Sequence, residues 1–337
     1  MPPLPDRGPR RGYVQFLHPA YPFPSNVLFQ LPRVDRLPDT DIVGVHHRTA
    51  LQACQIIANN AFETGRLELD KDGQRAVDTA LDSILTEDSY FFFVTDDPGA
   101  FSDWRFPHGH IPDVWLAAHT HVPSAPQQEV DVPRCGISNI SLSVDTAHFV
   151  PRQADEWYTM NSMNVYSDAS PGDIDNLANT VQLASHIHRS FDDRLMVIVP
   201  KLSEEGSDSG PVYRFVAHIL QPRGEEFWSD YHNIIVQYLN RLSGPYLFAR
   251  FAWAVLFLAN PFILRRVPRS VIRVKRSPQG EVLGYEGTTL TGAQLQSLYG
   301  FGGSHSEAER GRKQLELEQL AKADRARYPE TAAEISL

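Results

Sequence analysis

The first third of the chain alternates short apolar runs with stretches in which apolar residues recur at helical spacing. Aromatic and β-branched runs bounded by prolines predict strands at 13–19 and 26–32. Helical spacing predicts a helix over 47–65, closed by Gly65, and a second helix over 74–88. The aromatic run at 89–97 predicts a buried strand. We therefore expect an α+β N-terminal domain over 13–127, after a disordered Pro- and Arg-rich segment at 1–12.

The middle of the chain, residues 128–223, predicts a small module of strands with one short helix. The run SLSVDTAHFVP alternates apolar and polar residues and stops at a proline, which predicts a strand with His148 at its exposed end. The run TVQLA predicts a strand over 180–184, and a short helix follows with Ser185 as its N-cap. Two further strands are predicted at 195–201 and 212–220.

Beyond residue 224 the pattern becomes helical. Helices are predicted over 225–242 and 244–266, within a helical region at 224–303. The stretch 245–264 approaches the length of a membrane span, but Arg250 and Pro261 interrupt it, which favours a buried core helix over membrane association. The charged segment 304–337 predicts a solvated helical tail. The expected fold class is α+β.

Length and cysteine content narrow the setting of the protein. At 337 residues the chain fits two or three domains. Its two cysteines, Cys54 and Cys135, lie far apart without a CxxC pair, which argues against a disulfide framework and against a structural zinc. The N-terminal sequence has no uninterrupted apolar core of the kind found in secretory signals. We expect an intracellular protein of the cytoplasm or nucleus.

The charge is unevenly distributed along the chain. The formal net charge is −10, yet residues 231–280 carry eight basic and no acidic residues. Six of these basic residues fall within twelve positions: Arg265, Arg266, Arg269, Arg273, Lys275 and Arg276. Such a basic strip could bind the phosphates of a nucleic acid. The alternative, to which we give equal weight, is that these side chains pair with carboxylates of the other domains.

The chemistry-bearing residues of the middle segment are histidines. His188 and Asp192 are four residues apart on the predicted helix, so they project from the same face and could share one divalent cation. His186 lies two positions before His188 and should point elsewhere. The HGH and HTH runs at 108–110 and 119–121 lack a frame of carboxylates, and we interpret them as surface histidines.

Three of these residues, in the order His148, Asn179 and His188, carry a resemblance to a known family. The flanking runs AHFVPR, then IDNLANTVQLASHIHRSFDD, then a strand ending in IVP, resemble the HNH endonuclease family with its ββα-metal fold. More narrowly, they are similar to the variant common in uncharacterised fungal HNH proteins. The resemblance covers 135–200, and the segment FARFAW at 248–253 also looks like a companion helix of those proteins.

The resemblance implies a role for each motif residue. His148 matches the general base that takes a proton from the attacking water. Asn179 matches the asparagine that orients the motif loop or helps to hold the metal, and His188 matches the metal ligand on the helix. One divalent cation, Mg²⁺, Mn²⁺ or Zn²⁺, is implied, and the substrate would be a nucleic acid, DNA in preference to RNA.

One position departs from the family pattern. Many members place Asp, Glu or His directly before the first histidine as a further metal ligand, whereas this chain has Ala147. The metal site would then consist of His188 with Asp192 or Asn179, completed by water and substrate oxygens. Two functions remain open: an HNH endonuclease, or a catalytically inactive HNH-fold scaffold that binds protein or nucleic acid.

Overall fold

The N-terminal part of the protein forms two small sheets. The computed structural model describes residues 12–94, 104–118, 132–167, 173–203, 211–264, 267–276 and 282–299. A four-stranded sheet has the order β2-β1-β7-β5, in which only β1 and β7 are parallel, and a three-stranded sheet has the order β3-β4-β6. Their bounds are β1 Tyr13–Leu17, β2 Val27–Pro32, β3 Asp35–Arg36, β4 Val43–His46, β5 Gly65–Glu68, β6 Ile84–Leu85 and β7 Ser89–Val94. The strands predicted in this region are confirmed.

The first predicted helix is confirmed, but it is shorter than expected. Helix α1 spans His47–Ile57, and the side chain of His46 accepts a hydrogen bond from the Thr49 backbone nitrogen at its N-terminus. Asn59 and Asn60 adopt φ angles of 56° and 66°, in the left-handed region that ends a right-handed helix. The helix therefore stops before Gly65, which begins β5 instead.

The helix predicted over 74–88 is wrong. The segment is irregular, with turns and the short strand β6, and its carbonyls of Leu81 and Ser83 accept hydrogen bonds from the first backbone N–H groups of α1, those of Arg48 and His47. The first N–H groups of a helix have no partner within the helix, so a neighbouring segment that supplies carbonyls stabilises it. This tertiary capping outweighs the helical periodicity of the segment.

The middle of the chain contains a hairpin followed by a helix. Strands β8 (Val144–His148) and β9 (Thr180–Ala184) pair antiparallel, with His148 opposite Thr180, and α4 (Ser185–Asp192) follows directly. Helix α4 packs against β8, β9 and the next strand, β10. Ser185 is the first helical residue rather than the N-cap, which is Ala184, and its hydroxyl donates to the Ser143 carbonyl. The predicted N-cap is therefore wrong, although the strands and the helix are confirmed.

The long connection between β8 and β9 carries its own short helices. These are α3 (Asp155–Met160) and three 3₁₀ turns, η1 (Arg152–Ala154), η2 (Met163–Tyr166) and η3 (Leu177–Asn179). Trp157 of α3 and Trp253 of the long helix α6 pack edge to face, with ring centroids 4.8 Å apart. The connection is thus attached to the core by aromatic packing.

A second hairpin follows α4. Strands β10 (Met196–Ser203) and β11 (Val212–Ile219) pair antiparallel as predicted. The helix predicted over 225–242 is wrong: only η4 (Pro222–Phe227) and α5 (Trp228–Tyr231) are helical, and the chain then runs beside β11 through a bridge between Val216 and Ile235. Backbone hydrogen bonds to the strand replace those of the expected helix.

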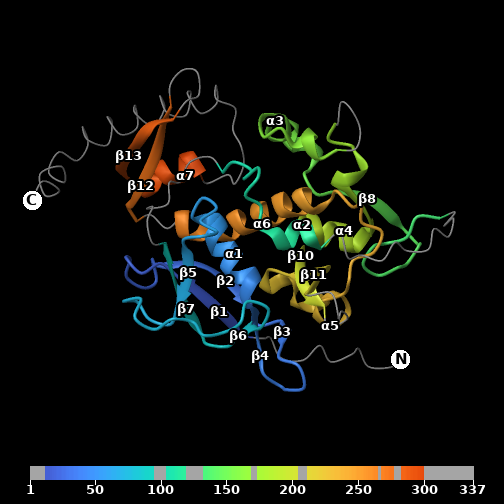
Figure 1. The fold of residues 1–337 in the computed structure, drawn as a ribbon, viewed down its shortest axis with the longest axis horizontal. Helices are drawn as coiled ribbons and strands as arrows, with labels where there is room; N and C mark the ends of the chain where they lie inside the picture. Colours follow the sequence, from blue (N-terminus) through green and yellow to red (C-terminus); the bar gives the residue numbers. More distant parts are fainter. Residues whose placement is uncertain are drawn as a thin grey trace, which may run out of the picture.

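Helix α6 (Gly244–Leu264) lies across the middle of the molecule (Figure 1). It packs against β2, β10 and the helices α1, α2 (Asp113–Ala117) and α7 (Gly292–Tyr299). Most of its apolar side chains are buried, so the predicted core helix is confirmed. Within the described part of the chain, no helix has both the length and the apolar character needed to cross a membrane.

The C-terminal region differs from the mainly helical structure that was predicted. Strands β12 (Arg269–Arg276) and β13 (Val282–Leu290) form a hairpin near one end of α6, whereas the β8 hairpin lies toward the other end (Figure 1). The alternation of basic and apolar residues in RSVIRVKR is typical of a strand. One hydrophobic core cluster contains residues from Val14 to Leu295, so the three predicted segments share a core. The predicted tail at 304–337 and residues 1–11 of the predicted N-terminal segment lie outside the described residues.

Candidate active site

His148 stands at the end of β8 beside a carboxylate that the sequence did not single out. Its Nε2 lies 2.8 Å from Oδ1 of Asp175, and the Nε of Arg152 donates to the same oxygen at 2.6 Å. The His148 side chain retains 12% of its exposure, whereas Asp175 is half exposed. The Arg152 hydrogen bond, together with that of His148, lowers the pKa of Asp175.

The ionised Asp175 determines which nitrogen of His148 carries the proton. A carboxylate can only accept hydrogen bonds, so the ring nitrogen that faces it, Nε2, must be the N–H. In the neutral imidazole this leaves a lone pair on Nδ1. The arrangement therefore presents a proton acceptor at Nδ1 and a carboxylate that would stabilise the imidazolium formed by protonation.

Asn179 connects the two ends of the long connection. Its side-chain oxygen accepts from the Val150 nitrogen at 2.8 Å, and its amide nitrogen donates to the carbonyls of Val150 at 3.0 Å and Ile174 at 2.7 Å. The residue is completely buried. Because both ends of the amide bind backbone and no part of it reaches solvent, the expected metal role of Asn179 is not supported, whereas its geometry suits a residue that orients the motif loop.

His188 on α4 lies between two carboxylates. Its Nε2 is 3.3 Å from Oδ2 of Asp192, one helical turn later, and its Nδ1 is 3.7 Å from Oδ2 of Asp145 on β8. All three side chains are partly or half exposed. His186 bonds the Tyr231 hydroxyl at 3.0 Å instead, in agreement with the expectation that its side chain points elsewhere.

The donor set at His188 fits a divalent cation. Two ligand atoms that each stand about 2.1 Å from one ion lie about 3 Å from each other, close to the 3.3 Å between Nε2 of His188 and the Asp192 oxygen. The other Asp192 oxygen lies 3.6 Å from the guanidinium of Arg250, which also donates to the Phe191 carbonyl and stacks over the Phe191 ring. Burial lowers the pKa of Arg250 to about 10.

The two imidazoles belong to separate groups of contacts. Positions 145 and 148 are about 10 Å apart along the strand, and alternation turns His148 to the side opposite Asp145. In the described part of the chain, no hydrogen bond, ion pair or ring contact joins His148 to His188. A substrate that used both would have to lie across the end of β8.

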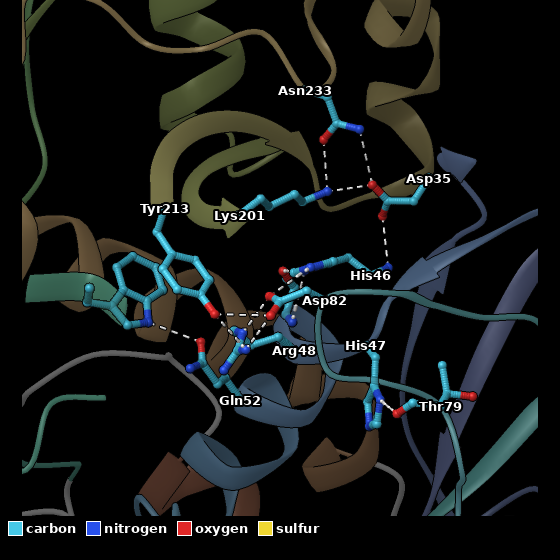
Figure 2. A network of polar contacts seen from close by, with 12 residues as sticks. Asp35, His46, His47, Arg48, Gln52, Thr79, Asp82, Lys201, Tyr213 and Asn233 are labelled. Carbon is cyan, nitrogen blue, oxygen red and sulfur yellow. Dashed lines mark hydrogen bonds and ion pairs between the residues drawn. The ribbon is translucent and has the colours of Figure 1, made fainter. Parts of the chain in front are cut away.

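A second cluster of histidines and carboxylates is buried, and its residues come from β3, β11 and the segment that follows α5. Ligand atoms of Asp35, His218 and His232 lie within 4.8 Å of one another, a grouping that could in principle hold a metal ion. Asp35 accepts four hydrogen bonds: from the His46 backbone nitrogen at 2.9 Å, His232 Nε2 at 2.9 Å, Asn233 Nδ2 at 3.3 Å and the Lys201 ammonium. Figure 2 shows Lys201 and Asn233 converging on Asp35.

The proton of His232 explains why this cluster suits hydrogen bonding better than an ion. The Ile219 backbone N–H donates to Nδ1 of His232 at 3.2 Å, so the ring proton lies on Nε2 and is donated to Asp35. The nitrogen that faces Asp35 therefore has no lone pair for a metal. Burial would raise the pKa of Asp35, but the charge of Lys201 and the hydrogen bond from His232 outweigh it and hold the pKa well below the usual value.

The predicted basic strip is only partly described. Arg269 is buried to 2% exposure, donates to the carbonyls of Ser25 and Phe262, and stacks on the rings of Tyr21 and Phe262. Its predicted contact with nucleic acid is therefore wrong, because the guanidinium is used inside the core. Arg265 and Arg266 lie outside the described residues, and for Arg273, Lys275 and Arg276 the structure describes the backbone in β12 alone.

Asp175 and Asp145 were not recognised from the sequence. Asp175 stands 27 residues after His148, and its position beside the histidine depends on the path of the long connection. A signal did exist for Asp145: it shares a strand face with Ala147, the position where the expected ligand is missing.

Comparison with known proteins matches part of the chain to a protein family. Residues 130–199 match the family model described as HNH endonuclease, a range that contains His148, Asn179, His188 and Asp192. No curated protein and no solved structure matches the chain.

Proposed function

We propose that this protein is a metal-dependent endonuclease that hydrolyses the phosphodiester bonds of nucleic acid, with DNA preferred to RNA. The observation that carries the proposal is the hydrogen bond between His148 and Asp175 at the end of β8, within the segment that matches the HNH endonuclease family. The narrower likeness to fungal HNH proteins stays a prediction.

His148 acts as the general base in this proposal. Its Nδ1 takes a proton from the attacking water while Nε2–H remains bonded to Asp175, which stabilises the imidazolium that forms. Arg152 holds the carboxylate in place from the other side. Asn179 keeps Val150 and Ile174 together, which fixes the connection that carries Asp175 relative to the end of the strand.

His188 and Asp192 would hold the divalent cation, Mg²⁺, Mn²⁺ or Zn²⁺. A bound cation of this kind polarises the phosphate and stabilises the leaving oxygen. Arg250 lies near one oxygen of Asp192 on the core side, and the other oxygen faces His188. Nucleic acid that used both groups would have to lie across the end of β8, because His148 and Asp145 point to opposite faces of the strand about 10 Å apart.

The alternative function is an HNH-fold scaffold that binds protein or nucleic acid without cutting. The observation in its favour is Ala147, which is completely buried under α4 and provides no ligand at the position where many HNH proteins have one.

Plasmid nicking in the presence of Mg²⁺, Mn²⁺ or Zn²⁺ distinguishes the two functions. The endonuclease proposal predicts nicking by the wild type that is lost in His148→Ala and His188→Ala. His186→Ala is the matched control, because His186 is an exposed histidine of the same helix that bonds Tyr231. Absence of nicking by the wild type with all three metals would instead support the scaffold.

A further inference from the structure

We propose that Asp145 is a positioning residue for the metal ligand His188 and compensates for the carboxylate that is missing at position 147. The inference rests on the proposed nuclease function and concerns the same site. It follows from the strand geometry of β8, from the two contacts of His188 and from the charges around α4.

The strand places Asp145 on the correct side of the hairpin. Side chains two residues apart in a strand point to the same face, so Asp145 and Ala147 share a face. That face is covered by α4, because Ala147 is completely buried and Asp145 lies beside His188. The carboxylate of Asp145 therefore lies beside α4 on the same strand face as position 147, two residues before it.

The carboxylates of Asp145 and Asp192 face different nitrogens of the His188 imidazole. Asp145 lies 3.7 Å from Nδ1 and Asp192 lies 3.3 Å from Nε2. A cation held between Nε2 and Asp192 requires the lone pair on Nε2 and therefore the proton on Nδ1, the nitrogen that faces Asp145. Histidines that bind metals commonly donate their other ring N–H to a carboxylate, which fixes the ring orientation and makes the ligand more basic. Asp145 acts through His188 in this arrangement.

The charges around α4 also support a role for Asp145 in binding the cation. Arg250 is buried with its guanidinium 3.6 Å from Asp192, and its positive charge opposes the binding of a cation at that carboxylate. Asp145 adds a negative charge on the opposite side of His188. Asp175, by contrast, is engaged by Arg152 and His148, so it does not fill this place.

Calorimetric titration of the full-length protein with Mn²⁺ and with Zn²⁺ tests the inference. We expect Asp145→Asn to weaken binding of the metal about 10- to 100-fold, the range found when such outer carboxylates are changed. Asp193→Asn is the matched control: it removes the same charge from the exposed residue directly after α4, and we expect a change of less than about twofold.

A double-mutant cycle separates positioning from charge. In a His188→Gln background the Asp145→Asn effect should disappear, because Asp145 acts through the imidazole. An equal loss in both backgrounds would overturn the positioning role and leave only a charge effect. Wild-type affinity in Asp145→Asn would overturn the inference while the nuclease proposal stands, whereas a wild type that binds neither metal would overturn both. Thermal unfolding checks that each variant is folded.

Discussion

The protein holds two groups of histidines and aspartates that differ in how completely their polar atoms are used. At the β8 hairpin, the side chains of His148, Asp175, His188 and Asp192 are all partly or largely exposed, and Nδ1 of His148 retains a lone pair. In the second group Asp35 is 4% exposed and accepts four hydrogen bonds. Residue types alone would make the buried group look like a metal site. Proton positions and exposure instead indicate that the group at the hairpin has polar atoms available for catalysis, whereas the buried group stabilises the fold.

The buried group connects three parts of the chain. Asp35 belongs to β3, Lys201 to β10, and His232 and Asn233 follow α5. A buried charge without its partner is strongly destabilising, because the remaining charge has lost both water and its counterion. Asp35 therefore stabilises the contact between the N-terminal sheets and the hairpin that follows α4.

The largest effect is expected for Asp35→Asn. The change leaves the Lys201 ammonium buried without its carboxylate, so the free energy of unfolding should fall by about 3–5 kcal/mol. Denaturant unfolding measures this value. The same replacement at the half-exposed Asp145 should cost less than about 1 kcal/mol. Equal losses at both positions would remove the distinction between the two groups.

The next effect concerns catalysis at the hairpin. Asp175→Asn replaces an acceptor by an amide that can donate to Nε2 of His148, which would move the ring proton to Nδ1 and remove the base. We expect nicking to fall by up to about 10²- to 10⁴-fold, as for loss of the base, with little change in stability. Arg152→Gln, which keeps the carboxylate, should reduce nicking less. The account of the His148 tautomer is wrong if Asp175→Asn cuts at the wild-type rate.

A change of pH is expected to have a smaller effect on the free energy of unfolding. Burial lowers the pKa of His46 to about 3 and holds that of His218 well below 6.5. Both are neutral in the folded protein, so below about pH 6.5 the unfolded chain binds more protons and stability falls as the pH falls. Each contributes about 1.4 kcal/mol per pH unit until its folded-state pKa is reached.

Unfolding measured between pH 7 and pH 5 checks this slope. His218→Gln should flatten it by about 1.4 kcal/mol per pH unit, because one of the histidines whose pKa is lowered in the folded protein is removed. His186→Gln is the control, since that side chain is exposed and bonds a tyrosine at the surface. An unchanged slope in His218→Gln would show that His218 is protonated in the folded protein.

The sequence predicted the elements that depend on local contacts, and it missed those that depend on contacts between residues far apart in the chain. His148, Asn179 and His188 stand in local runs whose alternation and helical spacing determine the hairpin and helix, so their elements were predictable. Asp35 meets residues 201, 232 and 233 across more than 160 positions, and no local pattern encodes that encounter. The irregular segment at 74–88 was predicted as a helix for the same reason, since its carbonyls of Leu81 and Ser83 bond the distant N-terminus of α1.

Arg269 shows that the distribution of charge along the sequence does not predict which arginines are exposed. In the sequence it belongs to a basic strip, but its guanidinium lies between two aromatic rings and donates to two backbone carbonyls. Net charge along a sequence does not distinguish an exposed arginine from one that stacks in the core.

Chemical rescue of His148→Ala tests the central claim most directly. If His148 is the base, nicking of plasmid DNA should fall about 10²- to 10⁴-fold in the variant. Added imidazole should restore part of the activity, whereas His188→Ala should not respond to imidazole because its defect is in binding the metal. Nicking by His148→Ala at the wild-type rate, without imidazole, would contradict the assignment of His148 as the base.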